Sequence, residues 1–357
     1  MQLLAEAVCR QASDILIIAG LPVSFKISSE IEQQGQVKLT PAMTEALIAE
    51  IYGLAQNRPM DNLLRRGDDD FSFSLPALSR FRVSAFRQRG SLAAVVRVIT
   101  FSLPERSVLH IPDEVIAFSE RRRGLVLVTG PAASGKSTTL ACIIDEINRT
   151  RAAHIITIED PIEFLHRHNK SVVTQREIST DTESYNGALR AALRQSPDVI
   201  LLGEMRDHET IRTAITSAET GHLVISTLHT AGAAKTIDRI LDAFPPEQQN
   251  QVRMQLAGIL QGIVCQQLIP AVDGARVPAF EILVANNAVR ALIRESKLHQ
   301  LESAMQTAGK EGTVTMDNYL AGLVERGLVE GEVALRYAYS PERLAKKLGL
   351  AFEGVST

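Results

Sequence analysis

The feature that most constrains the fold is a glycine-rich loop between two regular segments. Residues 130–138 read GPAASGKST, which matches the Walker A pattern G-x-x-x-x-G-K-S. The apolar residues 125–129 before the loop predict a strand, and the pattern of residues 136–149 after it predicts a helix. A strand followed by such a loop and a helix is the context that the motif requires, so the sequence predicts a phosphate-binding unit.

The residue types of this loop suit the chemistry of phosphate. Glycines let the backbone pass close to phosphate oxygens with its N–H groups turned inward, and the helix N-terminus adds partial positive charge. Lys136 is expected to reach the β- and γ-phosphates of ATP, and the Ser137 hydroxyl is expected to bind Mg²⁺. The predicted nucleotide-binding residues of the loop are Gly130, Ser134, Gly135, Lys136, Ser137 and Thr138.

Strand and helix patterns alternate on both sides of this loop, which predicts an α/β fold with a parallel sheet and helices on both faces. Strands are expected at 125–129, 155–158, 199–202 and 223–227, and helices at 136–149, 184–195, 207–219 and 233–243. Residues after about 285 are expected to be helical. Cys265 lies in an apolar run that has the pattern of a helix.

The first hundred residues have a different pattern, which predicts an α+β domain. Two short strands are expected within residues 13–28, a helix at 41–55, and antiparallel strands at 71–74, 80–86 and 92–99. The segment after them contains two prolines and predicts a linker. The expected division is a domain at 1–100, a linker at 101–112, a core at 113–285 and a helical region at 286–357.

Two acidic segments are candidates for the catalytic part of the site. In DVILLGEMRD, residues 198–207, an apolar strand ends at Glu204, as in a Walker B strand whose carboxylate faces the metal and the attacking water. In IITIEDPIEF, residues 155–164, Glu159 and Asp160 follow a strand and Glu163 comes after the turn, where they can orient water near the γ-phosphate. The alternative for the second segment is a solvated acidic turn.

Two histidines bracket another predicted strand. His222 and His229 lie at either end of the apolar residues in TGHLVISTLHT, residues 220–230. A single histidine is most often structural, but two around a core strand near a phosphate-binding loop can donate hydrogen bonds to phosphate.

Charge, aromatic content and cysteine spacing argue against several other classes of protein. The net charge is −3 and aromatic residues make up 4% of the chain, which argues against a channel that stacks and tracks nucleic acid. The three cysteines are far apart, so they form no Cys-x-x-Cys zinc site. Neither a signal peptide nor an apolar segment long enough to span a membrane is expected.

The segments GPAASGKSTTL, TIEDPIEF, ALRQSPDVILLGEMRD and ETGHLVISTLHT occur in this order and resemble the Walker A, Asp, Walker B and His boxes of the secretion and pilus ATPases. The resemblance covers nearly the whole chain. AVRALIRESK, residues 288–297, is similar to a signature of the type IV pilus retraction ATPases. It is also readable as an ordinary amphipathic helix, and the two interpretations are compatible. We therefore expect a protein without the long N-terminal extension and the tetracysteine zinc loop of assembly ATPases.

The resemblance implies a PAS-like N-terminal domain, a RecA-like ATPase core and a cytoplasmic homohexamer. Such a ring uses ATP and Mg²⁺, acts on the inner-membrane platform of the pilus from the inner face of the membrane, and drives twitching motility. Motion is expected from hinge closure at about residues 101–112. No nucleic acid and no direct membrane span are implied.

The resemblance also implies roles for single residues. Glu163 becomes the leading candidate to activate water, Glu204 assists through Mg²⁺ or water, and His229, with His222, contacts the γ-phosphate region. FRVSAFRQRG followed by VVRVI matches the family segment that supplies arginine fingers, which makes Arg82 and Arg97 catalytic candidates. Without the resemblance, both arginines are readable as surface charges on strands.

The sequence departs from the family pattern at a few positions. Ala132 and Ala133 replace the usual Thr-Gly in the loop, Leu16 stands where His is usual, and Lys26 stands where Arg is usual. Three other functions stay open: a pilus-extension or type II secretion ATPase, a nucleic-acid translocase, and a ring that binds nucleotide without hydrolysing it.

Overall fold

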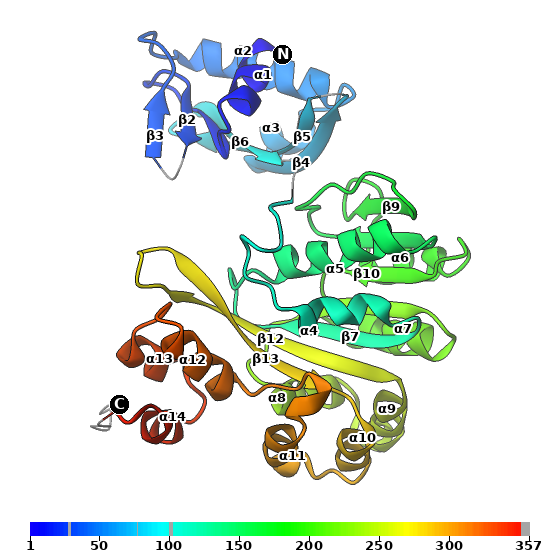
Figure 1. Ribbon diagram of the computed structural model, residues 1–357. Helices are drawn as coiled ribbons and strands as arrows, with labels where there is room; N and C mark the ends of the chain where they lie inside the picture. Colours follow the sequence, from blue (N-terminus) through cyan, green and yellow to red (C-terminus); the bar gives the residue numbers. More distant parts are fainter. Residues whose placement is uncertain (28–29, 77, 100–102, 351–357) are drawn as a thin grey trace. The chain divides into compact units, whose positions relative to one another are not determined.

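The computed structural model describes residues 1–27, 30–76, 78–99 and 103–350, coloured along the sequence in Figure 1. The chain divides into two compact units. Met1–Ser102 with Glu163–Leu165 form the first, and Leu103–Ile162 with His166–Thr357 form the second. Residues 101–102 of the predicted linker and 351–357 of the predicted helical region lie outside the described residues.

The first unit is built on an antiparallel sheet with strand order β3-β2-β1-β6-β5-β4. Its strands are β1 (Asp14–Ile17), β2 (Ser24–Ile27), β3 (Glu30–Gln33), β4 (Asp68–Leu75), β5 (Ser79–Gln88) and β6 (Ser91–Ile99). Apolar side chains on one face pack against the helices α1 (Gln2–Cys9), α2 (Pro41–Leu54) and α3 (Asp61–Arg66). The expected antiparallel strands and the helix near 41–55 are therefore present.

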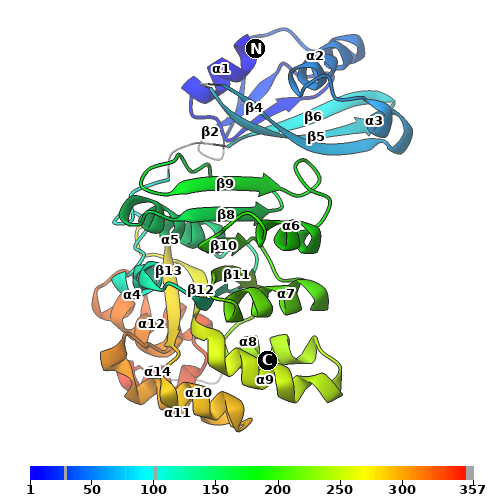
Figure 2. The ribbon, with the colours of Figure 1, turned by 90° about the vertical axis from the view of Figure 1, so that its right-hand side faces the viewer.

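The second unit is built on a sheet with strand order β13-β12-β7-β11-β10-β8-β9, whose β9, β8, β10 and β11 are seen one below another in Figure 2. Its strands are β7 (Gly124–Thr129), β8 (His154–Glu159), β9 (Val172–Glu177), β10 (Val199–Leu202), β11 (Leu223–Leu228), β12 (Leu260–Pro270) and β13 (Arg276–Val284). Neighbouring strands are parallel except β13, which pairs antiparallel with β12. The predicted parallel sheet is confirmed, and the antiparallel edge is an addition to it.

Helices cover both faces of this sheet, as expected. One face packs against α6 (Tyr185–Ala192), α7 (His208–Glu219), α8 (Ala233–Asp242), α9 (Pro246–Ile259), α10 (Asn287–Arg294) and α11 (Leu301–Thr307). The other face packs against α4 (Asp113–Ile116), the 3-10 helix η1 (Ala117–Glu120) and α5 (Lys136–Thr150). Because both faces are covered, the strands are almost continuously apolar.

The C-terminal helices form a smaller core of their own against β12 and β13. They are α12 (Met316–Glu325), α13 (Gly331–Tyr337) and α14 (Pro341–Leu348), and the short 3-10 helices η2 (Leu298–Gln300) and η3 (Gly309–Glu311) precede them. No helix in the described ranges of the chain is long and apolar enough to cross a membrane.

The helical interpretation of the segment around Cys265 was wrong, because this residue lies on strand β12. Most of the segment is buried between the two layers of helices, so its apolar residues Ile263, Val264 and Cys265 follow one another without the alternation that marks a half-buried strand. A continuous apolar run of this kind cannot be told from a buried helix by pattern alone.

The close packing of β12 gives a testable prediction for stability. Gly262 lies next to an irregularity in the pairing of β12 with β7, and a Cβ added to it would stand 2.2 Å from the ring of Phe118 and 2.7 Å from the carbonyl oxygen of Leu283. We expect Gly262→Ala to lower the free energy of unfolding by about 3 kcal/mol, because the backbone or the ring must move. Urea-induced unfolding measures this.

Gly258→Ala is the matched control, because a Cβ at Gly258 in α9 meets nothing within 4 Å. We expect this variant to change the free energy of unfolding by less than about 1 kcal/mol, and to raise rather than lower it. Equal losses in the two variants would contradict the steric explanation.

Candidate nucleotide-binding site

The phosphate-binding loop lies where the sequence placed it, between the carboxyl end of β7 and the N-terminus of α5. Gly130 and Gly135 have φ angles of 145° and 86°. Residues with a Cβ atom rarely adopt such angles, so these two positions need glycine. The Ser134 hydroxyl is buried and has no hydrogen-bond partner among the described residues. Such an orphaned donor inside the loop fits an anionic ligand.

A glutamine of the neighbouring strand braces this loop. A Cβ on Gly130 would stand 2.1 Å from the carbonyl oxygen of Gln266, and one on Gly135 would stand 2.9 Å from its side-chain nitrogen. The Gln266 side chain also accepts a hydrogen bond of 2.7 Å from Thr139 in the first turns of α5. Gln266 was missed by sequence reasoning, because its role depends on the pairing of β12 with β7.

Lys136, His229 and Glu204 form a chain of polar contacts at the carboxyl edge of the sheet. The ammonium of Lys136 donates to the carbonyl oxygens of Gly130 and Pro131, at 2.9 and 2.8 Å, and lies 3.4 Å from His229 Nδ1. His229 Nε2 lies 3.5 Å from Glu204 Oε1. Three predicted residues from separate segments therefore meet at one point.

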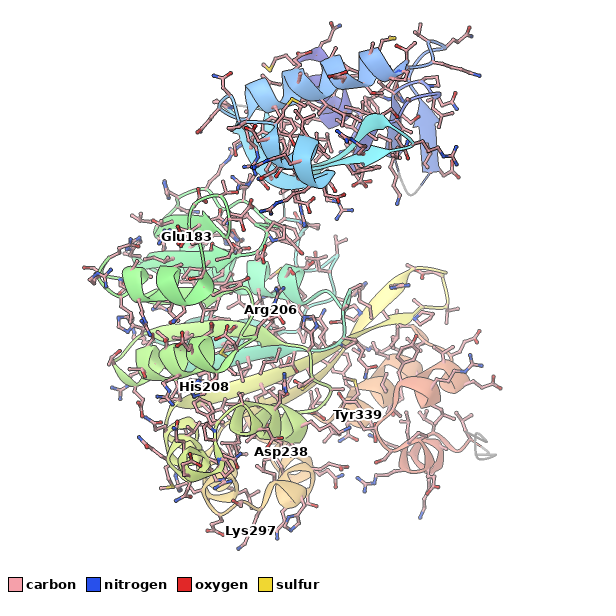
Figure 3. All side chains as sticks on the ribbon, turned by 180° about the vertical axis from the view of Figure 1, so that it is seen from behind. Glu183, Arg206, His208, Asp238, Lys297 and Tyr339 are labelled. Atoms are coloured by element: carbon pink, nitrogen blue, oxygen red, sulfur yellow. The ribbon has the colours of Figure 1, made fainter. Side chains whose placement is uncertain are left out.

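Glu204 is held in place from both sides. Its Oε2 accepts a hydrogen bond of 2.7 Å from Arg206, which is labelled in Figure 3, and this bond raises the pKa of the Arg206 guanidinium. The preceding Gly203 is fixed by two bonds, because its N–H donates to Ile158 and its carbonyl oxygen accepts from Thr227. Arg206 was also missed, although the arginine stands two residues after the predicted glutamate.

The acidic segment after β8 lies at the same edge. Arg206 stands 4.0 Å from an oxygen of Asp160, and Glu159 accepts hydrogen bonds from Thr157 and Gln175. Burial raises the pKa of the nearby Tyr185, and the charge of Asp160 adds to this shift. Because β8, β10 and β11 are parallel neighbours, their carboxyl ends bring these acids to the side of the sheet where the loop lies.

His222 is not brought to this edge. It precedes β11, its ring contacts the carbonyl oxygen of Ser217, and its own carbonyl oxygen accepts from Gly124 at the start of β7. The histidine therefore lies at the amino edge of the sheet, one strand length from the loop. This position argues against the expected contact with a nucleotide in the same chain's loop.

The remaining predicted residues belong to the first unit. Arg82 and Arg97 face each other across β5 and β6, and Arg97 forms an ion pair of 2.9 Å with the buried Asp14. No ion-pair partner of Arg82 is found among the described residues. Glu163 is exposed and is grouped with this unit.

A metal site made by the protein alone is not evident. Within the described part of the chain, no three His, Cys, Asp and Glu side chains gather so as to hold a metal ion. The two predicted Mg²⁺ ligands, Ser137 at the start of α5 and Glu204 after β10, leave the rest of the coordination to phosphate and water, as Mg²⁺ sites usually do.

The profile of the family described as "Type II/IV secretion system protein" matches residues 1–326. The chain belongs to this family. Within the Type II/IV secretion system family, it is 46% identical over 341 residues to the "Type IV pilus retractation ATPase PilT" of Pseudomonas aeruginosa, covering 96% of this chain and 98% of that protein.

Two further relatives cover almost the same length. The type IV pilus ATPase PilU of Pseudomonas aeruginosa is 38% identical over 351 residues, covering 98% of this chain and 91% of that one. A crystal structure of the pilus retraction motor PilT with bound ADP is 47% identical, with a TM-score of 0.88, and covers 97% of this chain and 98% of that chain. The mixed α/β fold is thus that of a nucleotide-binding member of the family.

The alanine pair in the loop gives a second testable prediction. Ala133 has a φ of 58°, in the left-handed region, which costs a non-glycine residue about 1–2 kcal/mol. Glycine at this position removes that cost. We expect Ala133→Gly to be more stable to urea than Ala132→Gly by about 1–2 kcal/mol, because both variants gain the same freedom when unfolded but only one relieves strain.

Equal stabilities of the two glycine variants would show that the loop leaves the left-handed conformation in solution. Comparison with the wild type separates the two contributions, since Ala132→Gly should lie below it by about 0.5–1 kcal/mol.

Proposed function

We propose that this protein is an ATPase motor that powers type IV pilus retraction. The observation that carries the proposal is the contact chain from Lys136 through His229 to Glu204, in a chain whose full length matches a retraction ATPase. In such a site Lys136 binds phosphate. Glu204 is separated from Lys136 only by the ring of His229, so its carboxylate is in position to act on water or metal. The reaction is hydrolysis of ATP to ADP and phosphate.

The predicted Mg²⁺ fits the same residues. When bound, the ion would neutralise charge on the phosphates, with Ser137 and Glu204 as its protein ligands. The loop backbone and the Ser134 hydroxyl bind and orient the phosphates, and Glu159 and Asp160 hold water at the edge of the site. His229 relays changes at the γ-phosphate to Glu204, because its ring touches both Lys136 and that carboxylate.

The finer assignments are part of the same proposal. Arg82 and Arg97 act as arginine fingers on the nucleotide, and Glu163 is the leading candidate to activate water, which the resemblance of their segments supports. Residues 1–100 form a PAS-like domain, 101–112 a hinge, 113–285 a RecA-like core and 286–357 a helical region. The antiparallel sheet with helices on one face and the parallel sheet with a phosphate-binding loop support this division.

The working assembly is proposed to be a homohexamer at the inner face of the cytoplasmic membrane. It would act through the platform protein of the pilus, because the described helices offer no membrane span of their own. In a ring, the N-terminal domain of one subunit can close on the ATPase core of the next. Arginine fingers on that domain would then reach a bound nucleotide only in the assembled ring.

The segment AVRALIRESK, which resembles a signature of the retraction ATPases, has a structural role in the second unit. Arg290 of α10 donates to the carbonyl oxygens of Ala257 and Gly258 at the end of α9, and to that of Ala285. Val289 and Ile293 are buried beneath it. The signature therefore helps to build the core, while its Arg294 is exposed.

Three measurements test the proposal. Purified protein should hydrolyse ATP, and chelation of divalent cations with EDTA should stop the reaction and excess Mg²⁺ restore it. A deletion strain should carry more surface pili than its parent and lose twitching. Absence of pili would favour an extension or secretion ATPase, and salt-sensitive DNA binding by the purified protein would favour a translocase. If the purified protein does not hydrolyse ATP at any protein concentration, the proposal that it is an ATPase is wrong.

A further inference from the structure

A buried carboxyl group on β13 lies at the N-termini of two helices. Glu281 is 5% exposed, and its Oε1 accepts a hydrogen bond of 2.8 Å from the backbone N–H of Ala233, the first residue of α8. The backbone of Met316, the first residue of α12, also hydrogen-bonds to this group. Gly232, the residue before α8, has no side chain that could cap the helix. Glu281 therefore provides the N-terminal cap of α8, although it lies far along the sequence.

The environment explains how this acid is accommodated inside the protein. Burial raises the pKa of the Glu281 carboxyl, and the N–H groups of Ala233 and Met316 oppose that shift. No lysine or arginine forms an ion pair with Glu281 in the described ranges of the chain. Its polar partners are the backbone N–H groups at these two helix N-termini, together with the thiol of Cys265 on β12. The free N–H groups and the helix dipole at a helix N-terminus favour a carboxylate.

The capped end of α8 is tied directly to the candidate site. Only three residues, 230–232, separate His229 from Ala233. Thr230 is hydrogen-bonded to Thr236 in the first turns of α8, and Thr236 in turn donates to the carbonyl oxygen of Gly232. With both ends of this short segment fixed, the place of His229 depends on where α8 begins.

We infer that Glu281 is a positioning residue for ATP hydrolysis: it fixes the start of α8 and thereby holds His229 between Lys136 and Glu204. The inference rests on the proposed function. The carboxyl group touches no residue of the nucleotide site itself, so its effect reaches the reaction through the segment after β11.

The same carboxyl group links the site to the C-terminal helices. Met316 and Asp317 begin α12, and Asp317 accepts hydrogen bonds from the N–H groups of Tyr339 and Ser340 ahead of α14. Tyr339, labelled in Figure 3, lines a cavity of about 470 Å³ together with Gly232, Ala233 and Glu281.

Glu281→Gln is the decisive variant, because it keeps the volume of the side chain and one acceptor oxygen. We expect kcat for ATP to fall about tenfold while KM changes less than twofold, since a displaced His229 impairs the chemical step more than binding at the loop. Hydrogen exchange of the backbone amides of residues 233–236 should become faster. Glu281→Ala, with no acceptor, should have the larger effect on both.

Asp317→Asn is the matched control. It weakens the cap of α14 in the same helical region but leaves the contact between Glu281 and Ala233 in place. We expect unchanged kcat and unchanged exchange at 233–236.

Four outcomes would overturn the inference. Faster exchange in Glu281→Gln with wild-type kcat would make the carboxyl group purely structural, and a rise in KM with constant kcat would place its action on nucleotide binding. Equal losses of kcat in Glu281→Gln and Asp317→Asn would show a general effect of loosening the C-terminal helices. If the wild type itself fails to hydrolyse ATP, the proposed function falls and this inference falls with it, which is distinct from an active wild type with an unaffected variant.

Discussion

Replacing Lys136 with alanine is expected to lower ATP turnover by at least about a thousandfold and to weaken ATP binding as well. Lys136 is only 8% exposed, and its ammonium is held along the loop by hydrogen bonds to the carbonyl oxygens of Gly130 and Pro131. Lys136 supplies the positive charge of the loop. Without it, the β- and γ-phosphates would face only the N–H dipoles of the loop backbone. Steady-state turnover and titration with a fluorescent ATP analogue measure the two effects.

Lys170→Ala provides the matched control, because Lys170 is exposed in the loop before β9, and its backbone is tied to Asn148 at the end of α5. This variant should keep wild-type turnover and affinity. Turnover by Lys136→Ala above about a tenth of the wild-type rate would contradict the role of the loop as the catalytic phosphate site.

The residues that could be predicted from the sequence are those whose role follows from the pattern of neighbouring residues. Lys136 is recognisable because a strand, a glycine-rich loop and a helix are contiguous, and their chemistry needs no knowledge of the rest of the chain. Glu204 is recognisable because it ends an apolar strand. The parallel order of the sheet followed from the alternation of strands and helices, which forces crossover connections.

The residues that escaped prediction act through strand register. Gln266 braces the loop only because β12 pairs with β7, and its own segment has the pattern of a helix. His222 and His229 look equivalent in the sequence, since each adjoins the same strand, but a strand has two ends and only the carboxyl end meets the loop. Glu281 carries no motif, because its partners, the backbone groups of two helices and the thiol of Cys265, meet it only in the folded chain.

Glu204→Gln is expected to separate catalysis from binding. The substitution keeps the shape of the side chain and one acceptor oxygen, but removes the charge between His229 and Arg206. We expect turnover to fall by about 10²–10³-fold with ATP affinity within threefold of the wild type, because loss of a positioned carboxylate affects the transition state more than the ground state. Single-turnover hydrolysis and equilibrium ATP binding measure the two quantities.

The control for this variant is Glu209→Gln on α7, which removes an exposed carboxylate bonded to Asn186 and should leave turnover unchanged. Comparison with Glu163→Gln then assigns the water-activating role. A larger loss in Glu163→Gln, at constant affinity, makes Glu163 the base and Glu204 the ligand of metal or water. A larger loss in Glu204→Gln reverses that order, and a loss of ATP affinity in Glu204→Gln would mean that this carboxylate acts mainly by holding Mg²⁺ on the nucleotide.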